Sequence, residues 1–264
     1  MITPESIAIN WTIKLLAFAI IFQTIELIRL SPAFSDKGVW RWSILKDEFK
    51  VFPKSIQNIL DKCLRYPNFL ILLYIRLVCA ILITVFPHPL ILSILFITVF
   101  LTLLRFRGTF NGGSDYMTLV VLSALTIASI FNKHEAVVSG ALWYIAIQAG
   151  LSYFISGLVK INKASWRSGK ALTAFVVSGN YEQPEWLLIL FKKPVISIIF
   201  SWCAMLLECF FPLAFADSTL CLVFVSAAFI FHVINFYVFG LNRFVFAWLA
   251  SYPALYYASG GFYN

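Results

Sequence analysis

Charged side chains are scarce in this chain: Asp, Glu, Lys and Arg make up 12% of its 264 residues. A soluble domain carries about 25% charged and about 45–50% apolar residues. Here the hydrophobic share is 61% and the mean hydropathy is +0.88. This shortage of charge excludes an ordinary soluble domain and indicates an integral membrane protein.

Cysteine and histidine are also few, with five and three residues. The cysteines form no C-x-x-C pair, and His88 and His134 lie in connections between apolar runs. The sequence therefore predicts neither a disulfide framework nor a metal site. No small-residue cleavage site follows the first apolar run, so we expect no cleaved signal peptide. The net charge of +8 does not indicate nucleic-acid binding, because the basic residues lie mostly between apolar runs.

Long, uninterrupted apolar runs fill most of the chain. A spanning helix needs about 20 apolar residues, and backbone groups in lipid must be hydrogen-bonded within the protein. We therefore predict an all-α fold, a polytopic transmembrane helical bundle of about eight spans. The expected spans are residues 7–28, 69–86, 90–104, 116–131, 137–160, 194–216, 219–239 and 244–258. Residues 171–177 and 186–191 are too short to span and are predicted to be re-entrant or interfacial helices.

The basic residues favour one side of this predicted bundle. The loops after the first, third, fifth and seventh runs hold eight, two, six and one Lys or Arg, whereas the opposite side holds only Lys133. By the positive-inside rule, this places both termini outside.

Residues 31–67 form the longest polar stretch, with seven Lys or Arg interleaved with aromatic and aliphatic residues. The pattern predicts a basic amphipathic segment that lies on the membrane surface; a docking face for a partner is the alternative. We expect residues 1–264 to form a single transmembrane domain that contains this segment.

Lys160 lies at the end of the fifth run. A lysine at membrane depth costs about 2.5–3.5 kcal/mol on insertion scales, so it needs a partner, a wet cavity or a neutral amine. A neutral amine would be a base. Snorkelling to the interface is the alternative. Ala149, Ser152 and Ser156 precede Lys160 at three- and four-residue spacing and form a small-residue face for close helix packing.

Three more polar residues lie within predicted spans. His232 and Asn235 are three residues apart on one helix face, and such residues tend to face a cavity; a structural histidine is the alternative. Glu208 in the sixth run must be protonated or paired. Its candidate partners are Lys160, Arg76 and Lys14, and a structural ion pair is the alternative to a functional one.

The loop RFRGTFNGGSD, residues 105–115, precedes the fourth run. Gly112 and Gly113 let the backbone approach a ligand closely, and Ser114 or Asp115 can cap the next helix. A helix N-terminus near lipid suits an anion or a phenolate oxygen. A tight loop without a ligand is the alternative.

Three blocks, in this order, resemble the horizontally transferred transmembrane (HTTM) domain, the membrane part of the vitamin K-dependent gamma-carboxylase superfamily. They are FNGGSDYMTLVVL (110–122), YFISGLVKINKASWRSG (153–169) and FHVINFYVFGLNRFVFAWLASYP (231–253). The similarity covers most of the chain. The chain is also similar to bacterial membrane proteins that mature the sporulation-delaying peptide toxin, which implies a multi-pass protein of the bacterial inner (plasma) membrane.

The resemblance implies an enzyme in which a lysine base, matched by Lys160, deprotonates a reduced quinone, with an active-site histidine matched by His232. The quinone would be like vitamin K or menaquinone. With O2, and CO2 where the reaction is a carboxylation, it would drive the modification of a peptide or a small carbon-acid substrate by a carboxylase-like lyase or a monooxygenase-like enzyme. The expected quinone-binding residues are Asn111, Gly112, Gly113, Ser114, Asp115, Tyr153, Trp166, Arg167 and Asn235, with Glu208 and Arg76 in support.

The chain departs from the carboxylase at three points. Gly113 stands where the carboxylase has a loop histidine, and Val159 stands where it has a second lysine beside the base. We also expect no extramembrane carboxylase domain, so a soluble or membrane partner would present a peptide substrate. The alternative function is a non-catalytic membrane partner in the export, maturation or immunity of a secreted peptide toxin. A quinone-binding electron-transfer subunit is a weaker alternative.

Overall fold

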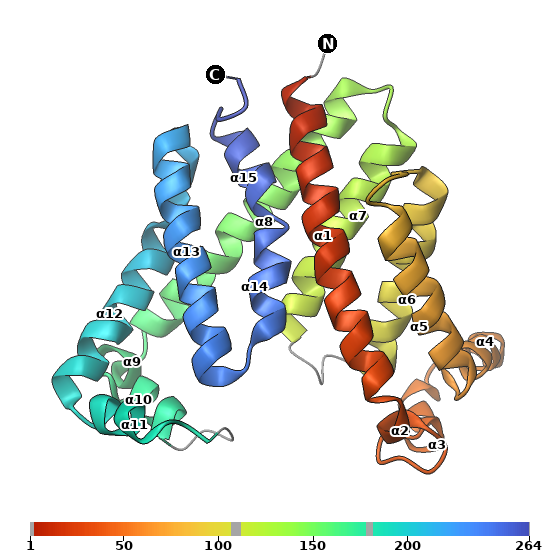
Figure 1. Ribbon diagram of the computed structural model, residues 1–264, viewed down its shortest axis with the longest axis horizontal. Coiled ribbons are helices and arrows are strands. Elements are labelled where there is room, and N and C mark those ends of the chain that lie inside the picture. The colour runs from red at the N-terminus through yellow and green to blue at the C-terminus, as the bar shows by residue number, and fades with distance from the viewer. Residues whose placement is uncertain (1–2, 107–111, 178–181, 264) are drawn as a thin grey trace. The chain divides into compact units, whose positions relative to one another are not determined.

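The computed structural model describes residues 3–106, 112–177 and 182–263, and these residues fold into helices joined by short connections (Figure 1). No strand occurs within these ranges. The continuous apolar runs explain this, because a helix bonds each backbone amide within its own segment. The prediction of an all-α polytopic bundle is confirmed.

Six helices in the described ranges are long and apolar enough to cross a membrane. They are α1 (Pro4–Arg29), α6 (Pro89–Phe106), α7 (Gly112–Ile130), α8 (Glu135–Ile161), α12 (Pro194–Phe210), which the 3-10 helix η2 (Phe211–Phe215) continues, and α13 (Ser218–Phe239). There are seven if α4 (Lys54–Leu64) and α5 (Asn68–Leu82), which meet at 71°, form one bent span. The predicted run 69–86 overlaps α5, which begins one residue earlier and ends four residues earlier. The predicted run 244–258 is divided between α14 (Asn242–Leu249) and α15 (Tyr252–Ala258).

The chain divides into two compact units. We call residues 13–138 the N-terminal unit, and residues 1–12 with 139–264 the C-terminal unit; α1 and α8 contribute to both. The expectation of a single domain over residues 1–264, without an extramembrane carboxylase domain, stays a prediction.

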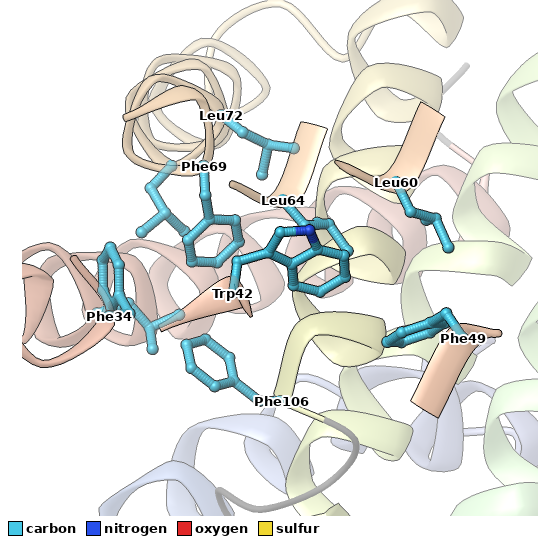
Figure 2. Close-up of a cluster of buried hydrophobic side chains, with 10 residues drawn as sticks. Phe34, Trp42, Phe49, Leu60, Leu64, Phe69, Leu72 and Phe106 are labelled. Carbon is cyan, nitrogen blue, oxygen red and sulfur yellow. The ribbon is translucent and has the colours of Figure 1, made fainter. Parts of the chain in front are cut away.

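In the N-terminal unit, α5, α6 and α7 pack against one another in chain order. Residues 31–67 fold into α2 (Ser31–Phe34), α3 (Trp42–Leu45), the 3-10 helix η1 (Lys46–Phe49) and α4. Figure 2 shows their buried side, where Trp42 and Phe34 gather with Phe69 and Phe106 from α5 and α6. The segment is therefore a folded part of this unit.

In the C-terminal unit, three short helices follow α8: α9 (Ala164–Arg167), α10 (Lys170–Val177) and α11 (Glu185–Phe191). The two short pieces predicted at residues 171–177 and 186–191 coincide with α10 and α11. The N-cap of α13 is Asp217, whose carboxylate accepts hydrogen bonds from the amides of Thr219 (2.8 Å) and Leu220 (3.0 Å). Its C-cap is Gly240, whose φ of 66° is the left-handed conformation that favours glycine.

Candidate functional site

The ammonium group of Lys160 points to a carboxylate inside the C-terminal unit. Its Nζ donates to both carboxylate oxygens of Glu208 on α12, 2.6 Å from Oε2, and to Ser156 Oγ at 2.9 Å. The Glu208 side chain is 4% exposed and that of Lys160 is 18% exposed. The pairing expected for Glu208 is therefore made with Lys160, and the amine is held within the helices.

A glycine on α8 makes this ion pair sterically feasible. A Cβ atom at Gly157 would lie 2.7 Å from the Cys209 backbone nitrogen and 3.0 Å from the Glu208 carbonyl carbon. Only a residue without a side chain lets α8 and α12 approach so closely. Lys160 follows one turn later on α8, so this close contact brings its amine within reach of Glu208.

A second polar group is centred on Tyr153. Its hydroxyl lies 2.7 Å from His232 Nε2 and 3.0 Å from the Tyr252 hydroxyl, so α8, α13 and α15 meet through one side chain. The ring of Tyr153 stacks on Phe211, with centroids 4.0 Å apart. His232 is buried, and its Nδ1 has no hydrogen-bond partner among the residues that the structure describes. The same holds for Nε1 of Trp248, whose ring centroid is 5.2 Å from that of His232.

Residues of both polar groups line one cavity of about 830 Å³ in the C-terminal unit: Ser156, Lys160 and Glu208 from the first, and Tyr153 and His232 from the second. Trp166 and Asn235 also line it, and the Trp166 ring lies 5.5 Å from Lys160 Nζ. Most of the remaining wall is aliphatic or aromatic. Several wall residues, such as Phe175, Ile230 and Ile234, are also exposed on the surface of the unit. The cavity is thus an apolar space with an amine–carboxylate pair and a tyrosine–histidine pair in its wall.

Six of the predicted site residues meet at this cavity: Tyr153, Lys160, Trp166, Glu208, His232 and Asn235. Arg167 is exposed on α9, where its Nη1 donates to the Ile161 carbonyl (2.6 Å) and its own carbonyl accepts from Trp202 Nε1 (3.1 Å). Its contacts hold the turn after α8, and a direct role in quinone binding stays a prediction.

The other predicted residues belong to the N-terminal unit. Gly112 and Gly113 begin α7, and Ser114 and Asp115 are buried in its first turn. The Asp115 carboxylate accepts from Gln23 Nε2, and Gln23 Oε1 accepts from Arg76 Nη2. Arg76 is thus joined to Asp115 through the amide of Gln23.

Asn111 lies outside the described residues. The expected part of residues 111–115 and Arg76 in quinone binding stays a prediction.

Three polar residues of these networks escaped the sequence analysis: Trp248 at the cavity, Tyr252 at the Tyr153 hydroxyl, and Gln23 beside Asp115. Trp248 and Tyr252 are four residues apart in the last run, and this spacing on one helix face was the available signal. Gln23 was visible as an amide in an apolar run, where a polar group needs a partner. Neither signal indicates the partner, because the partners lie far away in the chain.

Among comparisons with known proteins, a family model described as the HTTM domain matches residues 116–259, more than half of the chain. The matched stretch contains all six predicted residues that line the cavity. No curated protein and no solved structure matches the chain. The similarity to sporulation-delaying peptide maturation proteins stays a prediction.

Proposed function

Because this chain belongs to the HTTM domain family, which links it to the gamma-carboxylase superfamily, we propose that it is an integral membrane enzyme that binds a reduced quinone in the C-terminal cavity and deprotonates it with Lys160. The observation that carries the proposal is the cavity itself. A basic amine and a carboxylate face an otherwise apolar space, with a buried histidine in the same wall.

The residues around the cavity suit a reduced, vitamin K- or menaquinone-like quinone. Sites for small ligands measure about 300–1,000 Å³ and combine apolar walls with a few polar groups, and a cavity of about 830 Å³ lies in this range. Aromatic side chains such as Trp166 and Phe244 offer flat faces to a ring. The buried polar atoms His232 Nδ1 and Trp248 Nε1 are available to a ligand oxygen, because neither is bonded within the described residues.

Lys160 and Glu208 would act as one acid–base unit. Transfer of a proton from Lys160 Nζ to the Glu208 carboxylate leaves a neutral amine, which can then take the proton of a quinol hydroxyl. Lys160 is then an ammonium and Glu208 a neutral carboxylic acid. The pair therefore carries a net charge of +1, which stabilises the negative charge that develops on the ligand oxygen. Tyr153 holds His232 through Nε2, which leaves Nδ1 to orient the ligand.

With O2, a bound reduced quinone supplies a base strong enough to remove a proton from carbon. The substrate of that second half is a peptide or a small carbon acid, and carboxylation with CO2 is its family-like form. This half of the proposal rests on the resemblance to the carboxylase. A partner protein would present the peptide at the membrane.

Quinone turnover tests the proposal. The protein is placed in nanodiscs with a reduced naphthoquinone and O2, and the quinone epoxide is measured by mass spectrometry. We expect epoxide from the unmodified chain and a loss of about 100-fold or more in Lys160→Ala, because a positioned base contributes about 10²–10⁴-fold. Lys160→Arg should lose as much, because a guanidinium stays protonated near neutral pH and cannot act as a base.

Lys163→Ala is the matched control, since Lys163 is exposed on the next turn of the chain and should keep full activity. Absence of epoxide from the unmodified chain, with menaquinone and ubiquinone analogues also tried, would contradict the proposal. That outcome would favour the non-catalytic partner in peptide export, maturation or immunity.

A further inference from the structure

Residues 31–67 are fastened to the N-terminal unit by polar bonds as well as by apolar packing. Trp42 Nε1 donates to Asp61 Oδ1 at 2.6 Å, which joins α3 to α4. Arg105 of α6, 1% exposed, donates from Nη2 to the carbonyls of Phe34 (3.2 Å) and Trp40 (3.0 Å). Its guanidinium carbon also lies 4.9 Å from the Phe69 ring centroid and 5.5 Å from that of Trp42. Because these contacts hold the buried side of the segment in place, they also fix which of its residues face outward.

The helix α4 carries one apolar stripe, of which only one half is covered by protein. Ile56, Leu60 and Leu64 follow each other at four-residue spacing, and Ile59 lies three residues after Ile56, so all four share a side of the helix. Leu60 and Leu64, nearer to α5, are buried in the cluster of Figure 2, whereas Ile59 is 60% exposed. Ile56 and the preceding Phe52 are exposed too, and Val51 is 84% exposed. The half of the stripe near α5 is therefore covered by protein, and the half that contains Ile56 and Ile59 is bare.

Basic residues lie near this bare half in the sequence. All seven Lys and Arg of residues 31–67 are exposed, against four Asp and Glu, for a segment charge of +3. Lys50, Lys54 and Lys62 lie within the same stretch as the exposed apolar side chains. An exposed apolar surface with exposed lysines close by in the sequence matches the boundary between acyl chains and anionic headgroups.

The angle between α4 and α5 suits a surface that lies at the membrane. The helix meets α5 at 71°, so if α5 crosses the bilayer near its normal, α4 lies about 20° from the membrane plane, in the orientation of an interfacial helix. The segment is tied at both ends to apolar helices, α1 and α5, which keep it near the headgroups. A fully solvated segment would leave Val51, Phe52, Ile56 and Ile59 in water as one patch.

We propose that residues 50–62 form a preformed binding face for anionic phospholipids. Val51, Phe52, Ile56 and Ile59 enter the acyl boundary, and the ammonium groups of Lys50, Lys54 and Lys62 bind lipid phosphates. The proposal is independent of any quinone chemistry, which concerns the C-terminal unit.

Depth measurements at two neighbouring positions test the apolar part of the proposal. Nitroxide labels are attached to Ile59→Cys and, as the matched control, Asn58→Cys, both in a Cys203→Ser background that removes the exposed native thiol. Asn58 is exposed about 100° around α4 from Ile59. In nanodiscs that contain phosphatidylglycerol, the label at 59 should be more accessible to oxygen than to an aqueous nickel complex, and the label at 58 should show the reverse. Equal, water-like access at both positions would overturn the proposal.

Lipid selectivity tests the charged part. Native mass spectrometry measures the ratio of phosphatidylglycerol to phosphatidylcholine bound to the full chain. The variants Lys50→Gln, Lys54→Gln and Lys62→Gln are measured one by one and as a triple variant. We expect selectivity for the anionic lipid to fall about fivefold for each lysine removed, from about 1 kcal/mol per basic residue at an anionic surface. Lys133→Gln, in a different connection, is the control and should change nothing. Unchanged selectivity in the triple variant would contradict the lipid proposal and favour a protein docked on this face.

Discussion

At the scale of single residues, the bond between Lys160 and Glu208 sets which charges lie at the cavity wall. Each charge alone would be costly at this depth, whereas together they satisfy each other and Ser156. The same pairing keeps a basic amine at the wall of an apolar space. A snorkelling lysine would instead place its amine at the membrane interface and leave only its methylene chain at the wall. A residue pair that stabilises the fold thus also supplies the group that the proposed chemistry needs.

A double-mutant cycle separates these two roles. We expect Glu208→Met to destabilise the protein by about 3 kcal/mol, because it leaves the partly buried ammonium of Lys160 without its carboxylate. Lys160→Met should cost a similar amount, and the double variant should recover most of the loss, because no unpaired charge remains. Unfolding by denaturing detergent, followed by tryptophan fluorescence, measures the three free energies. Glu185→Met, at an exposed position on α11, is the control, and additive losses would show that the pair does not couple.

At the scale of elements, the contact between α8 and α12 determines whether Lys160 and Glu208 meet. Gly157 brings the two helices together at the level of Cys209. Gly150, two turns earlier on α8, faces η2, because a Cβ added there would lie 2.7 Å from the ring of Phe215. Two glycines seven residues apart therefore let α8 lie close to the α12–η2 span. Small residues at the contact are a usual means of close helix packing in membranes.

Replacement of Gly157 by alanine should separate the two helices. The added Cβ would meet the backbone of Cys209 at 2.7 Å, and overpacking of this kind costs about 1–3 kcal/mol. We also expect loss of quinone turnover, since Lys160 would be moved away from Glu208. Gly140→Ala on the same helix has nothing within 4 Å of the new Cβ, so it should be neutral or slightly stabilising. Thermal unfolding in detergent compares the two, and equal stability of both variants would show that the close contact is not required.

At the scale of the whole molecule, a polar cluster joins the first and last turns of the described chain. Glu5 Oε1, in the first turn of α1, accepts from the hydroxyls of Tyr257 (2.8 Å) and Tyr263 (3.2 Å), all within the C-terminal unit. Residues near both ends therefore lie on one side of the membrane, which requires an even number of crossings. Six long helices satisfy this, and if the α4–α5 pair is a seventh, α14 and α15 must together make an eighth.

We expect reporter fusions at the two termini to lie on the same side, and on the outside, as the basic loops predict. In intact cells, if the bundle has eight spans and outside termini, a thiol reagent that cannot cross the membrane should label Lys133→Cys but not Lys163→Cys, because these exposed residues lie in connections on opposite sides. With six spans and outside termini, the two results exchange. Fusions on opposite sides would contradict an even number of spans. Fusions on the same side but inside would refute only the orientation taken from the charge distribution.

The sequence by itself determined the class of the protein and two of its central residues. A chain with 61% hydrophobic residues in long runs has few choices other than membrane helices, because lipid offers no partner to an open backbone. Lys160 and His232 stood out for the same reason, since polar groups in apolar runs are expensive. The three blocks that resemble the HTTM domain depended only on local order and spacing.

Tertiary structure alone decided the partners. Glu208 had three candidate cations in sequence, and the choice of Lys160 depends on how closely α8 and α12 pack at Gly157. Tyr252 reaches Tyr153 from 99 residues away, and nothing near either residue indicates the other. Hydropathy and periodicity report which side of a helix is apolar. Contacts between helices that are distant in the sequence depend instead on how their side chains fit in space, and these contacts form the cavity.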